Sequence, residues 1–103
     1  MAKALEKASL SQERVEDFER AIDAADAVLP PLRAFVLPAG TPKATALHLA
    51  RTVCRRAERH VVHLAVKEEV PELFLVYLNR LSDLLFALAR LANHEAGQAD
   101  VTW

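Results

Sequence analysis

The sequence predicts an all-α protein, an up-down bundle of three long helices within a single domain. Only two of the 103 residues are glycine, and apolar residues make up 52% of the chain. Alanine, leucine, arginine and glutamate dominate, all of them good helix formers, and no stretch alternates apolar and polar residues as a strand does. With 26% charged residues the chain is globular rather than disordered, and its length allows one core.

The first helix is predicted to begin at Ser11, a residue type that caps helix N-termini. Before it, residues 1–10 are expected to form a disordered lead-in. Apolar residues then recur at helical spacing and should face the core: Val15, Phe18, Ile22, Ala25 and Val28 or Leu29. Pro30 and Pro31 should end or kink this helix, because proline lacks an amide hydrogen.

A short connection at 35–40 (FVLPAG) leads to the second helix. Pro38 disfavours helix just before it, and Gly40 permits a tight bend. Thr41 followed by Pro42 is typical of an N-cap with proline in the first turn, so we expect a helix from about Pro42 to Glu68. Its core positions alternate between spacings of three and four: Leu47, Ala50, Cys54, Ala57, Val61 and Leu64.

The third predicted helix runs from Pro71 to about His94 and is apolar on more than one face. Its main stripe is Phe74, Tyr77 or Leu78, Leu81, Leu84 or Leu85, Leu88 and Leu91. Further apolar residues lie off the stripe: Leu75, Val76, Phe86 and Ala89. Such a helix needs more than two neighbours, so we expect the chain to associate or to lack helices. Gly97 should end the order and leave 95–103 as a loose tail.

Charge and cysteine content narrow the function. The formal net charge of −1, from 13 Lys and Arg against 14 Asp and Glu, argues against a general nucleic-acid or membrane-surface binder. The N-terminus lacks the apolar run of a secretory signal, and no segment approaches the roughly 20 apolar residues of a membrane span. The single cysteine, Cys54, cannot form an intramolecular disulfide and is expected to be a small buried hydrophobe. We therefore expect a cytoplasmic protein.

The candidate site combines arginines of the second helix with an Asn/Asp pair of the third. Residues 51–59 (RTVCRRAER) hold four arginines and one glutamate, and Asn79 and Asp83 lie one turn apart in an otherwise apolar helix. Phe86 and Arg90 continue the face of Asn79 and Asp83. Spacings of three and four place one set on a stripe beside the core: His48, Arg51, Arg55 and Glu58. Arg56 and Arg59 lie further round. The planar guanidinium fork suits the oxygens of a polyanion.

Both groups also have a structural interpretation. The arginines and Glu58 form a solvated ladder worth a few tenths of a kcal/mol per pair in this alternative, while Asn79 and Asp83 make interhelical contacts. One observation argues against the ladder: Arg51 and Arg55 repel one another at their spacing of four. An anion bound between them would relieve this electrostatic repulsion. The joint occurrence of the two groups favours a binding site.

Other candidates are weaker. His60 and His63 are spaced by three, but no further ligand at a suitable spacing completes a metal site, and none is expected. His48 and His94 are interpreted as packing or surface residues. The spacing suggests no Ser/His/Asp arrangement, and the sequence contains no glycine-rich phosphate loop.

Four motifs carry a resemblance to a known family: 35–40 (FVLPAG), 46–51 (ALHLAR), 54–59 (CRRAER) and 77–86 (YLNRLSDLLF). In order and spacing they resemble the C-terminal half of the PduO-type ATP:cob(I)alamin adenosyltransferases. The resemblance implies transfer of the 5′-deoxyadenosyl group of ATP, bound with Mg²⁺, to the cobalt of cob(I)alamin or another corrinoid, giving adenosylcobalamin and triphosphate. It also implies part of a five-helix bundle and a homotrimer with active sites between subunits.

The resemblance also implies roles for individual residues. Five match positions that contact ATP: Arg55, Arg56, Glu58, Arg59 and Asn79. Arg51 matches an arginine that pairs with an acidic residue across the subunit interface, and Asp83 matches a residue that orients arginines. Phe35 matches the aromatic residue beside the corrinoid, where an apolar side chain displaces the lower axial ligand and eases reduction to Co(I). Because Co(I) is itself the nucleophile, no protein nucleophile is expected.

The sequence departs from this family in two respects. The Thr/Gly/Asp-rich phosphate loop and its lysine, which belong to the family's N-terminal half, are not among the 103 residues, and Ala39 replaces a second glycine. Arg51 is then expected to lack its acidic partner within the chain. The alternative function is accordingly that of a non-catalytic truncated relative, a helical assembly module or one that binds ATP or corrinoid without transfer.

Overall fold

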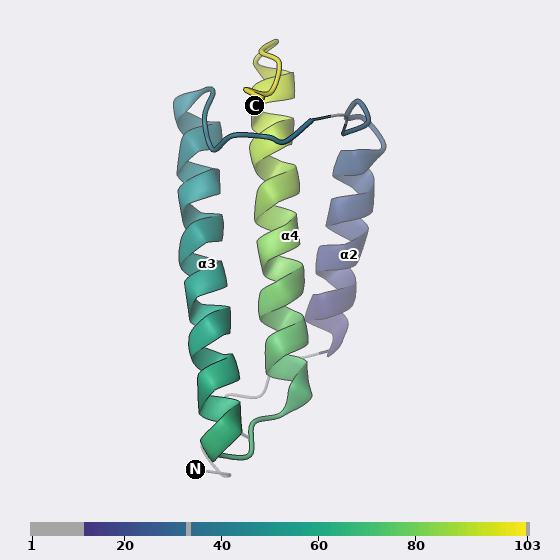
Figure 1. Ribbon diagram of the computed structural model, residues 1–103. Coiled ribbons are helices and arrows are strands. Elements are labelled where there is room, and N and C mark those ends of the chain that lie inside the picture. The colour runs from purple at the N-terminus through teal and green to yellow at the C-terminus, as the bar shows by residue number, and fades with distance from the viewer. Residues whose placement is uncertain (1–11, 33, 103) are drawn as a thin grey trace.

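The computed structural model describes residues 12–32 and 34–102, in which three helices run up, down and up (Figure 1). Helix α2 spans Gln12–Asp26, α3 spans Pro42–Lys67 and α4 spans Glu72–Glu95. The only strand-like pairing in the described ranges is an isolated antiparallel bridge between Val36 and Thr102. The predicted all-α, three-helix fold is therefore confirmed. The expected lead-in of residues 1–10 and the cap at Ser11 lie outside the described residues.

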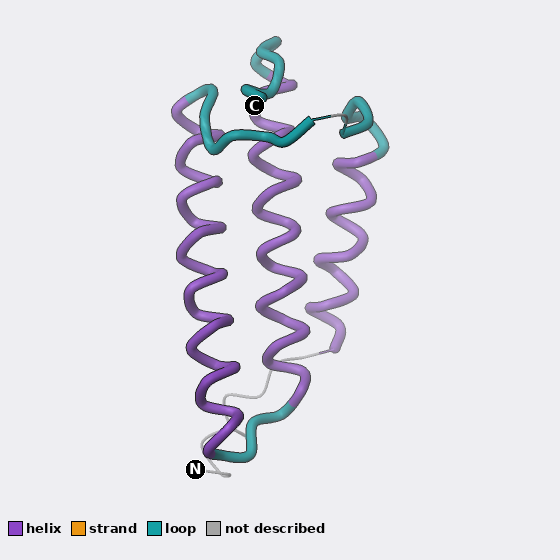
Figure 2. The backbone as a smooth tube through the Cα atoms, in the orientation of Figure 1, coloured by secondary structure: helices purple, strands orange, loops and turns teal. Residues whose placement is uncertain are grey.

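The last helix in the sequence is the middle helix in space. Helix α4 lies between α3 and α2 and packs against both, whereas α2 and α3 have no close backbone approach over their described lengths (Figure 1). The connection between α2 and α3 crosses α4 at one end of the bundle (Figure 2). This arrangement explains the apolar surface of α4 beyond one stripe, since both flanks are covered. Small side chains allow the closest approach, with Ala87, Ala89 and Ala92 at most 7% exposed.

The helix boundaries follow the local signals of the sequence. Thr41 Oγ1 accepts a hydrogen bond from the Ala44 amide at 3.1 Å, which caps α3 as predicted. Helix α3 ends at Lys67, one residue before the predicted end, and α4 begins one residue later than predicted because Pro71 occupies its N-cap position. Helix α2 ends at Asp26, so the chain leaves the helix before Pro30 rather than at it.

The buried face of α3 differs from the predicted stripe. Cys54 is buried as expected, but Ala50 and Leu64 are exposed, while His48 is only 3% exposed. This face is turned toward the side of the helix that carries His48 and Arg51, because α4 is the one helix in the described structure that packs against α3. The turn brings part of the polar stripe into the seam between the two helices.

The residues after α4 fold back onto the connection before α3. Gly97, at a φ of +73°, follows the last turn of α4. The Leu37 amide then donates to the Val101 carbonyl at 2.7 Å, next to the bridge between Val36 and Thr102. These contacts differ from the loose tail expected at 95–103. None of the helices in the described structure is both long and apolar enough to cross a membrane.

Candidate functional site

The part of the site nearer the start of α3 is an aromatic and cationic cluster in the seam between α3 and α4. The Arg51 guanidinium carbon lies 4.8 Å from the centroid of the Phe86 ring, a cation–π distance. The His48 ring packs edge-on against the same phenyl ring, with centroids 6.1 Å apart. Arg51 and His48 therefore share one aromatic neighbour on α4, although sequence reasoning assigned Phe86 only an apolar role.

The predicted residues Glu58 and Asn79 meet across the same seam. Asn79 Nδ2 donates to Glu58 Oε2 at 3.5 Å, and Arg80 Nη1 donates to Asn79 Oδ1 at 2.7 Å. Arg80 Nε in turn donates to Glu19 of α2 at 3.0 Å, so the chain of contacts links all three helices. The amide of Asn79 is thus held from both sides.

The arginines of α3 have no carboxylate partner within the described part of the chain: no ion pair includes Arg51, Arg55, Arg56 or Arg59. Arg51 and Arg59 are about 12 Å apart along the helix axis. The ladder between Arg55 and Glu58, the structural alternative, is not among the ion pairs formed. The cationic face consequently offers free guanidinium donors to an anion.

The electrostatics of Arg51 show the same deficit of negative charge. Burial lowers the pKa of Arg51, the neighbouring charge of Arg55 lowers it further, and Asp83 partly offsets both. Arg51 Nε is buried without a hydrogen-bond partner among the described residues. Asp83 thus acts on Arg51 through its charge, while its own side chain is exposed.

Phe35 lies apart from the arginines. It belongs to the connection that leads into α3, and 72% of its surface is exposed. Arg55 lies thirteen residues beyond Pro42, about 20 Å further along the axis of α3. The structure therefore places the phenyl ring at one end of the bundle and the ATP candidates along its side, without direct contact between them.

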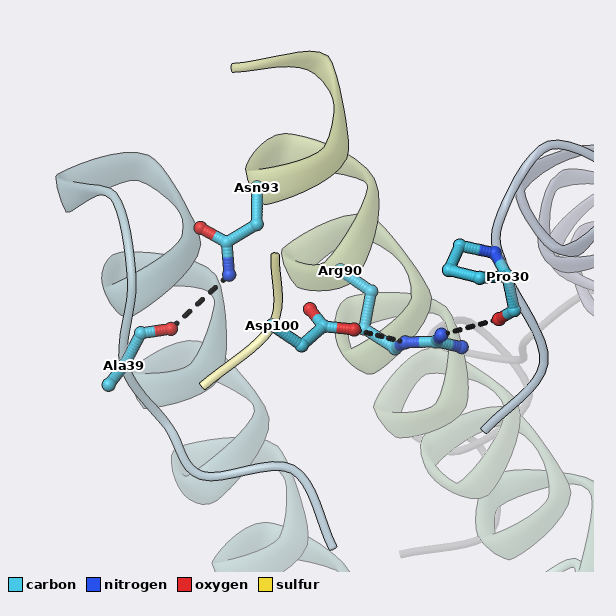
Figure 3. A network of polar contacts seen from close by, with 5 residues as sticks. All are labelled: Pro30, Ala39, Arg90, Asn93 and Asp100. Atoms are coloured by element: carbon cyan, nitrogen blue, oxygen red, sulfur yellow. Dashed lines mark hydrogen bonds and ion pairs between the residues drawn. The ribbon is translucent and has the colours of Figure 1, made fainter. Parts of the chain in front are cut away.

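Sequence reasoning missed the contacts of two polar residues near the C-terminal end of α4, Arg90 and Asn93, which hold this end of the bundle together (Figure 3). Arg90 donates from Nε to Asp100 Oδ2 at 2.9 Å and from Nη2 to the Pro30 carbonyl at 2.8 Å. Its side chain is only 6% exposed. Arg90 and Asn93 lie three residues apart in an otherwise apolar helix end, and this pattern could have indicated buried polar contacts. The partners of the two side chains could not be predicted from the pattern.

The second missed residue, Asn93, is fully buried. Its Oδ1 accepts a hydrogen bond from the Thr41 amide at 2.9 Å, and its Nδ2 donates to the Ala39 carbonyl at 3.3 Å. Between these two contacts lies Gly40, at a φ of +124°. The amide therefore occupies the inside of the bend that leads into α3.

His48 is buried, in agreement with the packing alternative given for it above. Burial lowers the pKa of His48, the charge of Arg51 lowers it further, and Asp100 partly opposes the shift. His48 Nε2 and Asp100 Oδ1 both lack a hydrogen-bond partner among the described residues. Within the same ranges no three His, Cys, Asp or Glu side chains are grouped as a metal site.

The fold is a helical bundle, and the arginine face of α3 has no ion pair among the described residues. These two features are typical of a protein that binds a polyanionic ligand. Comparison with known proteins makes the class specific. The sequence profile described as cobalamin adenosyltransferase matches residues 1–92, and the chain belongs to this family.

Individual relatives support the assignment. The chain is 50% identical over 94 residues to a corrinoid adenosyltransferase from Bacillus subtilis, covering 91% of this chain and 49% of that protein. It is 45% identical over 98 residues to corrinoid adenosyltransferase PduO from Citrobacter freundii, covering 95% of this chain and 29% of that protein. The chain thus spans about half or less of the relatives that it matches.

Solved structures show the same fold. A variant PduO-type ATP:corrinoid adenosyltransferase from Lactobacillus reuteri, complexed with cobalamin and ATP, superposes with a TM-score of 0.87 at 40% identity, over 91% of this chain and 50% of that one. Another variant of the type from the same organism, complexed with ATP, gives 0.87 at 40% identity, over 91% and 54%. The resemblance to this family found in the sequence is confirmed.

Proposed function

We propose that this chain supplies the arginine side of a site for ATP and a corrinoid, and that it serves transfer of the 5′-deoxyadenosyl group of ATP to cob(I)alamin. One observation carries the proposal: four arginines lie within about two and a half turns of α3 without an ion pair in the described residues. Relatives whose structures are complexed with cobalamin and ATP indicate which anion and which second substrate to test.

In this proposal the triphosphate of ATP, bound with Mg²⁺, lies along the cationic face. Arg55, Arg56 and Arg59 are exposed and would donate to its oxygens, while Glu58 and Asn79 bind from the seam. The Co–C5′ bond forms with the electron pair of Co(I), and the C5′–O bond breaks, with its bonding pair leaving on the triphosphate. Fixed guanidinium groups stabilise the departing negative charge, which is the step at which they lower the barrier.

Arg51 and Asp83 are proposed to order the arginine face. Arg51 is held over Phe86 and feels the charges of Arg55 and Asp83. An acidic partner for Arg51 would come from outside this chain. The exposed apolar side chains of α3, Leu49 at 65% and Val53 at 49%, favour a further subunit against another side of this helix, and we propose a homotrimer.

Phe35 is proposed to lie beside the corrinoid. An exposed phenyl ring on the connection before α3 is an apolar surface with no partner in the described structure. Placed against the lower face of a corrinoid, it would keep the lower axial ligand away from cobalt. Loss of that ligand makes reduction to Co(I) easier.

The test is an anaerobic assay of the full chain with ATP and cob(I)alamin, in which adenosylcobalamin is followed by absorbance and solution mass is measured in parallel. Arg55→Ala should lose about 2–4 kcal/mol of transition-state stabilisation, which is roughly 30-fold to 1000-fold in rate. Arg14→Ala, an exposed arginine of α2, is the matched control and should keep full activity.

The outcomes separate the two candidate functions. No product, together with no thermal stabilisation by ATP, refutes the enzyme proposal for this chain. Stabilisation by ATP without product favours the alternative of a binding or assembly module. An Arg55→Ala variant with wild-type activity refutes the site assignment.

A further inference from the structure

The bend at Ala39–Gly40–Thr41 is built around the side-chain amide of Asn93, whose bond to Ala39 is drawn in Figure 3. Asn93 is 0% exposed, and a buried amide is costly unless its donors and acceptors are satisfied. Its two side-chain bonds both go to this bend, one to the Thr41 amide and one to the Ala39 carbonyl. Within the described residues the side-chain amide of Asn93 therefore bonds only to the connection before α3 and to no other element.

Gly40 fits closely over the same amide. A Cβ at Gly40 would lie 2.3 Å from Asn93 Oδ1 and 2.5 Å from Nδ2, far inside contact distance. The φ of +124° at Gly40 is also one that side chains rarely adopt. Residues 39–41 can thus approach Asn93 only because glycine stands between the two bonded residues.

The segment that carries Phe35 is also held on its other side. The Leu37 amide bonds to the Val101 carbonyl at 2.7 Å, and Val36 bridges to Thr102. The backbone on the C-terminal side of Phe35 is therefore held by this antiparallel pairing, while the phenyl ring itself is 72% exposed. A large apolar ring presented on a fixed backbone is suited to meet a flat ligand without ordering cost.

We propose that Asn93 is the positioning residue for Phe35: through Thr41 and Ala39 it sets the path of the connection, and so the place at which the phenyl ring meets the corrinoid. The inference rests on the proposed function for the identity of the ligand. The role of the amide in holding the segment rests on geometry alone. Asn93 acts through the backbone and does not touch the reacting atoms.

The test uses Asn93→Ala and, from the other side of the contact, Gly40→Ala, which leaves the helix interior intact if the first variant folds poorly. His94→Ala is the matched control, because His94 is the exposed neighbour of Asn93 on α4. Hydrogen exchange measures the segment without any ligand, and the Thr41 amide should exchange about tenfold faster in Asn93→Ala. The control should exchange as the wild type does.

The kinetic readout separates positioning from general damage. In both variants KM for cob(I)alamin should rise by about tenfold or more and kcat should fall, because misplacing a contact group by about 1 Å costs up to a hundredfold. KM for ATP should stay within about twofold, since the arginine face is remote from the bend. The double variant should be no worse than the poorer single one, because both changes break the same contact.

Equal increases of the two KM values, or effects that add in the double variant, would overturn the proposal. A wild-type chain that forms no product and is not stabilised by ATP refutes the proposed function separately. In that event exchange at 34–41 and binding of cob(II)alamin, followed by the spectral change on loss of its lower ligand, decide the role of Asn93. Equal binding by wild type and Asn93→Ala then overturns it.

Discussion

The buried ion pair between Arg90 and Asp100 should be among the most costly contacts to break. Asp100→Ala leaves a guanidinium that is 6% exposed, with the Pro30 carbonyl as its remaining partner in the described structure. Removing one partner of a buried pair costs about 3–5 kcal/mol. Because the Pro30 carbonyl still accepts a hydrogen bond from Arg90, we expect the lower end of this range, about 3 kcal/mol. For a domain of this length that lowers Tm by roughly 10–20 °C.

The assay is urea unfolding, followed by helical circular dichroism, of Asp100→Ala, Arg90→Met and the double variant. The coupling energy from this cycle should be about 2 kcal/mol or more. The matched control is the surface pair between Asp17 and Arg20, whose side chains are 59% and 68% exposed and whose coupling should stay below about 0.5 kcal/mol. A coupling below about 0.5 kcal/mol for the buried pair would refute the reasoning.

Three further predictions concern single residues. Thr41→Ala should lower the free energy of unfolding by about 1 kcal/mol, whereas Thr41→Ser should keep most of the cap, as denaturant titrations would show. Burial and Arg51 lower the pKa of His48, so below about pH 6.5 the unfolded chain binds a proton that the folded protein excludes, and stability falls on acidification. His48→Gln should flatten that decline in unfolding free energies measured from about pH 8 to 5.5; an unchanged slope would contradict it. Burial and Glu58 raise the pKa of Cys54, so iodoacetamide should label the folded protein far more slowly than the unfolded chain near neutral pH.

The helices could be predicted because their ends are determined locally. Thr41 can cap a helix and Pro42 is favoured in a first turn, so these two residues determine the start of α3. The structure confirms both the cap and the first turn. The buried face of α3 could not be predicted equally well, since it depends on where α4 lies. Periodicity alone favoured Ala50 and Leu64, whereas the packed helix buries His48.

The candidate site divides in the same way. The arginine face and Asn79 were found because charged and amide side chains in an apolar helix are visible in the sequence, although their roles in ATP binding stay predictions. The contacts of Arg90 and Asn93 could not be predicted because their partners lie 10 to 60 residues away in the sequence. Most of those partners are backbone groups with no sequence signature. Only a resolved fold can identify a carbonyl as a partner.

The central place of α4 has a consequence for how the chain is made. Helices α2 and α3 each pack on α4, and over the described residues neither packs on the other. During synthesis both emerge before Glu72–Glu95 and so leave the ribosome with their apolar faces uncovered. Among the described residues, neither helix gains a helix–helix contact until α4 has been translated. A ribosome stalled shortly after Lys67 should therefore display a protease-sensitive chain, and one stalled after the full sequence, with a linker through the exit tunnel, a resistant one.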